Sequence, residues 1–216
     1  NYKDALSSRG NYGVTKKYPH TPGIDAVGFI ESSKSEKFKI GQEVIVSGFD
    51  LGMNTPGGFG EYIRVPSSWV CHLPKNLTAK ESMAIGTAGL TAGLCIKKLK
   101  KLNGINGKNA VVTGATGGVG SFAIKLLKLL GANVTAITTK LNEERFLKMI
   151  GADEIISKKK FIISVRKPMG KGIWDIAVDT VGGDILSNLI PSMKYGGVIT
   201  CCGNVAGPSF NATVYP

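Results

Sequence analysis

The sequence contains few of the residues from which disulfide frameworks and metal centres are built. It has four cysteines and two histidines among 216 residues. No two cysteines form a C-x-x-C pair, and the adjacent Cys201 and Cys202 would point to opposite faces of a strand, so they are poor disulfide partners for each other. Neither His20 nor His72 has an acid–cysteine or acid–serine set nearby. We therefore expect a reduced, cytoplasmic protein without a cysteine-based zinc site.

Long apolar runs are also missing. None reaches the ~18 residues needed to span a bilayer, so we expect no membrane partner. The polar start at residues 1–4 has no signal-peptide pattern. Because the first residue is not Met and a strand-like stretch stops at Pro216, we expect a chain that is truncated at both ends.

Acidic residues are scarce relative to basic ones. There are 15 Asp and Glu against 27 Lys and Arg, which gives a formal net charge of +12. A basic surface concentrates anionic partners such as nucleic acid, membranes or phosphate-bearing small molecules. The lysine-rich run at residues 97–101 is explained by a solvated helix face, and attraction of a nucleotide or coenzyme A is the alternative. No RNA-binding motif or zinc finger accompanies the charge, which argues against a nucleic-acid partner.

The amino-acid composition of the chain changes near residue 75. The preceding part is rich in glycine and proline, and short alternating segments at residues 42–46 and 61–65 predict strands of a small β-rich domain. Residues 78–81, Thr-Ala-Lys-Glu, match a capping box. A helix is predicted to begin there and to run toward Gly86, a plausible connector. We expect a β-rich domain at 1–78 and a second domain at 79–216.

From about residue 108 strands and helices alternate. A buried strand is predicted at 109–113, a helix with apolar residues at helical spacing at 119–130, and a C-terminal glycine cap at Gly131. The remaining predictions are a helix at 142–150 and strands at 134–138, 154–156, 175–181 and 197–202. This alternation indicates an α/β fold with a doubly wound parallel sheet of the Rossmann type.

The stretch T-G-A-T-G-G-V-G at residues 113–120 fits two nucleotide-binding fingerprints. One is the short-chain dehydrogenase loop, and the other is a G-x-G-x-x-G loop whose first glycine is replaced by Ala115. Short-chain enzymes need a Tyr-x-x-x-Lys pair downstream of the loop. Only Tyr12 and Lys16 have that spacing, and they lie upstream, so this alternative is rejected.

The glycines follow a predicted strand and open a predicted helix, which is the context in which such a loop binds a dinucleotide. Gly117 permits close approach of the backbone to a pyrophosphate, and Gly120 permits tight packing of the helix on the strand. The N–H groups around residues 118–121 would point at the anion. An ordinary tight turn is the alternative that we reject.

The end of the second predicted strand indicates which dinucleotide binds. An NAD site usually places Asp or Glu there, whereas an NADP site prefers hydroxyls and a cation. This chain has Thr138-Thr139-Lys140, with no carboxylate before Glu143. We therefore predict NADPH rather than NADH. The alternative is that these residues are simply polar groups at a strand end.

Several stretches now support a family resemblance. A β-rich domain before a Rossmann domain is the layout of the medium-chain dehydrogenase/reductase superfamily, and P-G-I-D-A-V-G at 22–28 looks like its P-G-x-D/E-x-x-G segment. The chain resembles most the YhdH/YhfP-type quinone oxidoreductase group, which includes acryloyl-CoA reductases. The supporting stretches are residues 1–6, 22–25, 85–92, 112–120, 179–182 and 195–197. The resemblance implies a GroES-like first domain.

The resemblance also bears on metal binding. The catalytic zinc ligands of the zinc-dependent members would fall here on Asn1, on Ile24-Asp25 and on Thr87, none of which is a thiolate or imidazole. Since tetrahedral zinc needs about three protein ligands, we predict no metal. What remains is hydride delivery to an electrophilic carbon. The resemblance implies NADPH-dependent reduction of acryloyl-CoA, or of a related enone or quinone.

The resemblance suggests site residues as well. Tyr2 is the first catalytic candidate, because it lies in the family's N-Y-K-D motif, and Tyr12 is the second; a packed tyrosine without a proton role is the alternative for Tyr2. Thr87 takes the place of a zinc ligand and is expected to contact the nicotinamide, as are Gly203 and Asn204. The full set of expected cofactor-binding residues is Thr87, Thr116, Gly117, Gly118, Val119, Gly120, Ser121, Thr138, Thr139, Lys140, Gly203 and Asn204.

Two other functions stay open at this stage. One is an NADPH-binding redox sensor without turnover, and the other is a nucleic-acid-binding member of the same superfamily. Members of the family often pair through the edge of the Rossmann sheet, so the resemblance allows a homodimer, but the oligomeric state stays open because the last strand of that sheet is expected to be missing from this chain. Consumption of NADPH with a substrate would separate the enzyme from both alternatives.

Overall fold

The computed structural model describes residues 1–164 and 172–213. The chain divides into two compact units, Asn1–Leu90 and Thr91–Pro216. Each unit is described by itself. The predicted domain boundary between residues 78 and 79 stays a prediction.

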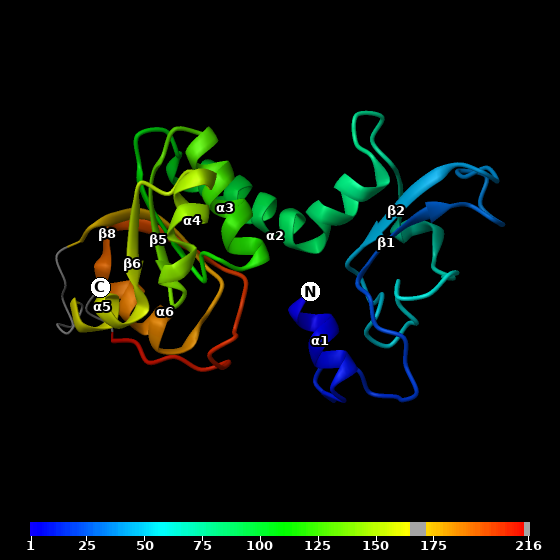
Figure 1. The fold of residues 1–216 in the computed structure, drawn as a ribbon, viewed down its shortest axis with the longest axis horizontal. Coiled ribbons are helices and arrows are strands. Elements are labelled where there is room, and N and C mark those ends of the chain that lie inside the picture. The colour runs from blue at the N-terminus through cyan, green and yellow to red at the C-terminus, as the bar shows by residue number, and fades with distance from the viewer. Residues whose placement is uncertain (165–171, 214–216) are drawn as a thin grey trace. The chain divides into compact units, whose positions relative to one another are not determined.

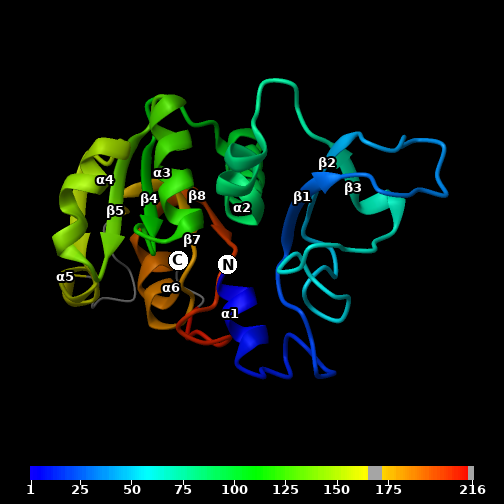
Figure 2. The ribbon, with the colours of Figure 1, turned by 45° about the vertical axis from the view of Figure 1, so that its right-hand side comes forward.

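The first unit contains a small antiparallel sheet in the order β1-β2-β3, which is labelled in Figure 2. Its elements are α1 (Tyr2–Ser8), β1 (Asp25–Phe29), β2 (Glu43–Ser47), η1 (Ser67–Trp69) and β3 (Val70–His72). The strand predicted at 42–46 is confirmed as β2, one residue later. The strand predicted at 61–65 is wrong, since the structure has no strand there and the next strand along the chain, β3, begins only at Val70.

Helix α2 (Ala79–Asn103) begins at the predicted capping box. The Glu81 carboxylate accepts the Thr78 backbone N–H at 2.9 Å, and the Thr78 hydroxyl oxygen accepts the Glu81 N–H at 3.2 Å. These bonds satisfy N–H groups that have no partner inside the helix. The first stretch of the helix runs to Gly86, as predicted. There a non-helical conformation at φ 45° and ψ −156°, which is open to glycine, kinks the chain before the helix continues to Asn103.

The second unit is built on five parallel strands in the order β6-β5-β4-β7-β8. This confirms the doubly wound parallel sheet, and the predicted helices at 119–130 and 142–150 correspond to α3 and α4. The elements are β4 (Asn109–Thr113), α3 (Gly118–Leu129), β5 (Asn133–Thr138), η2 (Leu141–Glu143), α4 (Glu144–Ile150), β6 (Glu154–Ser157), α5 (Lys158–Ser164), β7 (Trp174–Asp179), α6 (Gly183–Leu189), η3 (Ile190–Ser192) and β8 (Met193–Cys201).

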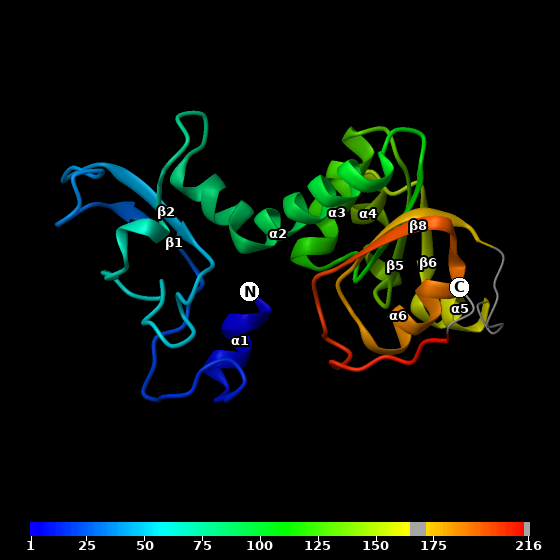
Figure 3. The same cartoon turned by 180° about the vertical axis from the view of Figure 1, so that it is seen from behind.

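Helices cover both faces of this sheet (Figures 1 and 3). On one face, α3, α4 and the second half of α2 pack on the strands through apolar residues such as Leu99, Ile124 and Leu147. On the other face, α5 and α6 pack through Phe161, Ile185 and Leu189. Because both faces are buried, the central strand β4 reads Ala-Val-Val without alternation, which is typical of parallel sheets.

Candidate functional site

The expected cofactor residues of the second unit lie at one edge of its sheet. In a parallel sheet all carboxyl ends meet at the same edge, and ligands bind there at the point where the strand order reverses. Here the order reverses between β4 and β7. The glycine loop follows β4, Thr139 and Lys140 follow β5, and Gly203 and Asn204 follow the end of β8.

The glycine loop has the backbone geometry that a dinucleotide-binding turn needs. Gly114 has φ +60°, and a Cβ on Gly120 would meet the Gly114 carbonyl oxygen at 2.4 Å. A side chain at Gly120 therefore has no room between helix α3 and the strand before it. Gly117 is the N-cap residue of α3, so the amides of Gly118, Val119 and Gly120 have no partner inside the helix, whereas the Ser121 N–H already donates to the Gly117 carbonyl oxygen at 2.9 Å. The loop fits the pyrophosphate of a dinucleotide.

A buried carboxylate joins the two strands at the reversal point. Asp179, at the end of β7, is 0% exposed and accepts the Thr113 hydroxyl at 2.5 Å from the end of β4. Its second oxygen accepts the Gly182 N–H at 2.9 Å, which forms the expected strand-end turn. The Thr180 hydroxyl donates to the Thr113 carbonyl oxygen at 3.0 Å. These bonds fix the ends of both strands beside the glycine loop.

The residues after β5 and β6 line a cavity of about 530 Å³. Thr138 is buried, and its hydroxyl oxygen accepts the Lys140 N–H at 2.9 Å, so this side chain shapes the turn. Thr139 and Lys140 are exposed. Sequence analysis missed the contribution of β6. The lining residues are Thr138, Thr139, Leu141, Ser157, Lys158, Lys159 and Ile162.

The parallel pairing of β5 with β6 would have predicted that the residues after β6 contribute to this cavity. Thr138 and Ser157 are partners in the parallel register of β5 and β6, so the residues that follow them must leave the sheet side by side. A cavity bordered by hydroxyls and lysine side chains, with no carboxylate among its lining residues, suits an anionic group.

Gly203 lies tightly against the turn after β7. A Cβ at this position would meet the Thr180 carbonyl oxygen at 2.1 Å, so only glycine fits. The Cys202 N–H donates to the Asp179 carbonyl oxygen at 2.9 Å, which continues the sheet pairing to the residue before it. The chain thus holds the half-buried Gly203 and the exposed Asn204 at the carboxyl edge of the sheet.

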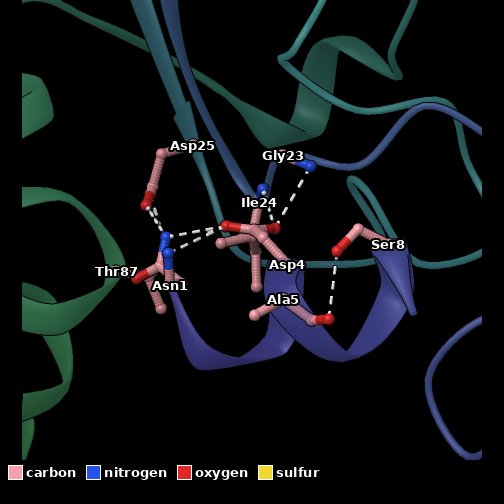
Figure 4. Close-up of polar contacts among 8 residues, drawn as sticks. All are labelled: Asn1, Asp4, Ala5, Ser8, Gly23, Ile24, Asp25 and Thr87. Carbon is pink, nitrogen blue, oxygen red and sulfur yellow. Dashed lines mark hydrogen bonds and ion pairs between the residues drawn. The ribbon is translucent and has the colours of Figure 1, made fainter. Parts of the chain in front are cut away.

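A separate polar cluster occupies the first unit (Figure 4). Both carboxylate oxygens of Asp25 accept hydrogen bonds: Asn1 Nδ2 donates to Oδ2 and the Thr87 hydroxyl donates to Oδ1, each at 2.8 Å. Gly86 lies beside this carboxylate, since a Cβ there would meet Asp25 Oδ2 at 2.8 Å. The kink in α2 therefore makes room for Asp25.

Asp4 extends the same cluster. This carboxylate is 5% exposed, and its Oδ1 accepts the backbone N–H groups of Gly23 at 3.1 Å and Ile24 at 2.9 Å. Its Oδ2 accepts Asn1 Nδ2 at 3.1 Å. Figure 4 shows the Asp4 side chain pointing from α1 toward these amides. Asp4 ties helix α1 to the chain that enters β1, a role that the sequence analysis missed.

The Asn1, Asp25 and Thr87 side chains do not fit a zinc ion. Tetrahedral zinc sites use thiolate, imidazole and carboxylate ligands, and this group offers an amide, a hydroxyl and one carboxylate whose oxygens both accept hydrogen bonds. Among the described residues, no three His, Cys, Asp or Glu side chains are grouped to hold a metal ion.

The two candidate tyrosines belong to the first unit and both are exposed. Tyr2 lies in helix α1 and is 55% exposed, and Tyr12 is 74% exposed. The Tyr12 ring meets the Tyr18 ring edge to face, with centroids 6.3 Å apart. Their catalytic roles stay predictions, as do the roles of the expected cofactor residues.

The fold and these sites define a nucleotide-binding α/β protein with an antiparallel β unit ahead of its Rossmann sheet. The family model described as the alcohol dehydrogenase GroES-like domain matches residues 1–75, and the one described as zinc-binding dehydrogenase matches residues 118–215. The chain belongs to the medium-chain dehydrogenase/reductase superfamily. In the described part of the chain, no helix is both long and apolar enough to span a bilayer.

Three relatives match nearly the whole chain. The putative quinone oxidoreductase YhfP of Bacillus subtilis is 40% identical over 100% of this chain, and a crystal structure of it with NAD bound gives a TM-score of 0.93. The probable acrylyl-CoA reductase AcuI of Escherichia coli is 39% identical over 100% of this chain. The yhdH oxidoreductase of Salmonella enterica, crystallised with NADP, is 40% identical over 99% of the chain with a TM-score of 0.93. The chain spans 66% of the length of each.

Proposed function

We propose that the protein is a reductase that uses NADPH to deliver a hydride to an activated C=C bond, with acryloyl-CoA or a related enone or quinone as acceptor. The observation that carries this proposal is the identity of 39–40% over the entire chain to AcuI and YhfP. An acryloyl thioester and a quinone share an electron-poor carbon conjugated to a carbonyl group. Neither needs a metal to make that carbon electrophilic.

The glycine loop at the start of α3 holds the pyrophosphate in this proposal. The first-turn amides from Gly118 to Gly120 donate to phosphate oxygens, and the closely packed Gly120 keeps helix and strand together. Gly203 and Asn204 approach the nicotinamide end. When bound, the coenzyme supplies the hydride, and the protein supplies placement and electrostatics.

Charge at the cavity after β5 and β6 supports NADPH over NADH. Lys140 follows β5 and Lys158 follows β6. Among the described residues, no carboxylate that would repel a 2′-phosphate lines the cavity. Thr139 adds an exposed hydroxyl donor. Relatives have been crystallised with either coenzyme, NADP for the Salmonella enterica protein and NAD for YhfP. The proposed preference for NADPH therefore rests on the charge around this cavity and not on the relatives.

The reaction in this proposal proceeds without zinc. The enolate that forms after hydride addition needs hydrogen-bond donors and then a proton. The Tyr2 and Tyr12 hydroxyls are the proposed proton donors, because both side chains are exposed and a phenol both donates and accepts hydrogen bonds. Thr87, whose hydroxyl is oriented by Asp25, is proposed to contact the nicotinamide.

A panel of acceptors tests the proposal. The protein is mixed with NADPH and with acryloyl-CoA, a simple enone or a simple quinone, and the loss of NADPH absorbance is followed. Turnover with at least one acceptor, at a higher kcat/KM for NADPH than for NADH, is expected. Binding of NADPH without turnover would instead support the non-catalytic redox sensor. Metal analysis after dialysis adds a second test, because one bound zinc per chain would contradict the zinc-free mechanism.

A further inference from the structure

Asp179, the last residue of β7, places a carboxylate in the interior of the second unit. The residue is 0% exposed. Its Oδ1 accepts the Thr113 hydroxyl at 2.5 Å, and its Oδ2 accepts the Gly182 N–H at 2.9 Å. Both oxygens therefore act as acceptors, which is what an ionised carboxylate offers.

This carboxylate has no cationic partner among residues 1–164 and 172–213. The ion pairs in that part of the chain use the carboxylates of Asp4, Asp153 and Asp175. The groups that donate to Asp179 are a hydroxyl and backbone amides, all of which are neutral. Burial of an unpaired charge costs stability, and water screens such a charge only weakly. The Asp179 charge can therefore act on a ligand that binds nearby.

The order of the strands places the nicotinamide half of the coenzyme on the Asp179 side. In the proposed function, on which this step rests, the 2′-phosphate lies at the cavity after β5 and β6, and the pyrophosphate lies at the glycine loop after β4. The strand order is β6-β5-β4-β7-β8. Because a dinucleotide runs along the carboxyl edge of such a sheet, its other half extends over the ends of β7 and β8.

Gly182 connects the Asp179 carboxylate to the residues expected at the nicotinamide. Its N–H donates to that carboxylate, and a Cβ on Gly182 would lie 3.3 Å from the Gly203 carbonyl oxygen and 3.4 Å from the Asn204 Cα. Gly182, Gly203 and Asn204 also line a pocket of about 380 Å³. Among the described residues, no Lys, Arg, Asp or Glu lines this pocket, so no charge in its wall offsets that of Asp179.

We propose that the Asp179 carboxylate stabilises the positive charge of the oxidised nicotinamide ring and thereby favours hydride transfer from NADPH. The hydride carries one proton and two electrons to the activated carbon of the acceptor, and one positive charge remains on the ring of the resulting NADP⁺. A negative charge that is fixed in place before the reaction stabilises the charge that develops. Asp179 acts here through its electric field, one residue behind the pocket wall.

The same charge should be visible in coenzyme binding without any turnover. NADP⁺ and NADPH carry identical phosphates, so the effect of Asp179 on the phosphates cancels in the ratio of the two Kd values. Only the charge of the ring differs. Opposite unit charges about 10 Å apart, at an effective dielectric constant of about 20, attract each other enough to change a Kd roughly tenfold. Removal of the Asp179 charge should therefore weaken binding of NADP⁺ relative to NADPH.

Calorimetric titration of the wild-type chain and of two matched variants tests this proposal. Asp179→Asn keeps the size of the side chain and removes the charge, so the ratio of the Kd for NADP⁺ to the Kd for NADPH should rise roughly tenfold. Thr113→Val breaks the same hydrogen bond but leaves the charge, so it should keep the wild-type ratio even if both Kd values rise. An unchanged ratio in Asp179→Asn, or the same change in both variants, would overturn the proposal, because a purely structural role affects both coenzyme forms alike.

A change at the exposed Asn204 tests the same field without disturbing the buried cluster. Asn204→Lys adds a cation at this end of the sheet and should shift the ratio in the same direction as Asp179→Asn, whereas Asn204→Gln should keep the wild-type ratio. Circular dichroism checks the fold of each variant. If Asp179→Asn does not fold, an unchanged ratio in Asn204→Lys overturns the proposal by itself. A wild-type chain that binds neither coenzyme would instead contradict the proposed function.

Discussion

The Thr87 hydroxyl donates a 2.8 Å hydrogen bond to Asp25 Oδ1, although 62 positions separate the two residues in sequence. The second Asp25 oxygen accepts Asn1 Nδ2 at the same distance. A carboxylate held at both oxygens is fixed in orientation and satisfied without a metal. The family resemblance places zinc-ligand positions of other members on these residues, and in this structure their side chains are hydrogen-bonded to one another.

The close approach of Gly86 to Asp25 predicts that Gly86→Ala lowers the stability of the folded protein. The new Cβ would meet Asp25 Oδ2 at 2.8 Å, and φ of +45° is strained for alanine, so the free energy of unfolding should fall by about 1–3 kcal/mol. The measurement is the urea midpoint of the first unfolding transition. Gly93→Ala is the control in the same helix. It meets no atom within 4 Å and should be neutral or stabilising by up to about 1 kcal/mol. Equal effects of both changes would contradict the crowding at Gly86.

Gly120→Ala should weaken coenzyme binding. Its Cβ would meet the Gly114 carbonyl oxygen at 2.4 Å, so helix α3 must shift away from the loop whose amides face the phosphates. We expect the Kd for NADPH to rise at least about tenfold, equivalent to about 1.4 kcal/mol, in a calorimetric titration. Ser121→Ala, which keeps the backbone in place, serves as the comparison and should change the Kd much less. An unchanged Kd in Gly120→Ala would argue against this loop as the binding site.

Lysines beside the β5–β6 cavity should control coenzyme choice. Replacing Lys140 or Lys158 by alanine removes a cation from the proposed 2′-phosphate site, so the Kd for NADPH should rise about tenfold for each change. The Kd for NADH should stay the same, because that coenzyme has no 2′-phosphate. Lys125→Ala, an exposed change on α3, controls for the general effect of charge. Equal losses for NADPH and NADH would contradict the assignment.

The sequence by itself determined the features that depend on neighbours along the chain. The capping box at Thr78, the glycine loop before α3 and the apolar period of that helix are local patterns, so the parallel α/β fold and the expected coenzyme loop could be predicted. The strand predicted at 61–65 failed because a strand also needs a hydrogen-bonded partner strand, which local alternation does not encode, and the described sheet β1-β2-β3 does not include these residues.

Only the tertiary structure decided which distant side chains meet. Asp25 with Thr87 and Asp179 with Thr113 are each joined across 62 or more positions, and no local pattern encodes those distances. The register of β5 and β6 likewise brought Lys158 to the expected coenzyme edge. The physical reason is that the partners of a polar side chain depend on how whole strands and helices pack. The apolar faces of these elements determine which elements pack together, but they do not determine the individual polar contacts at the ends of the strands.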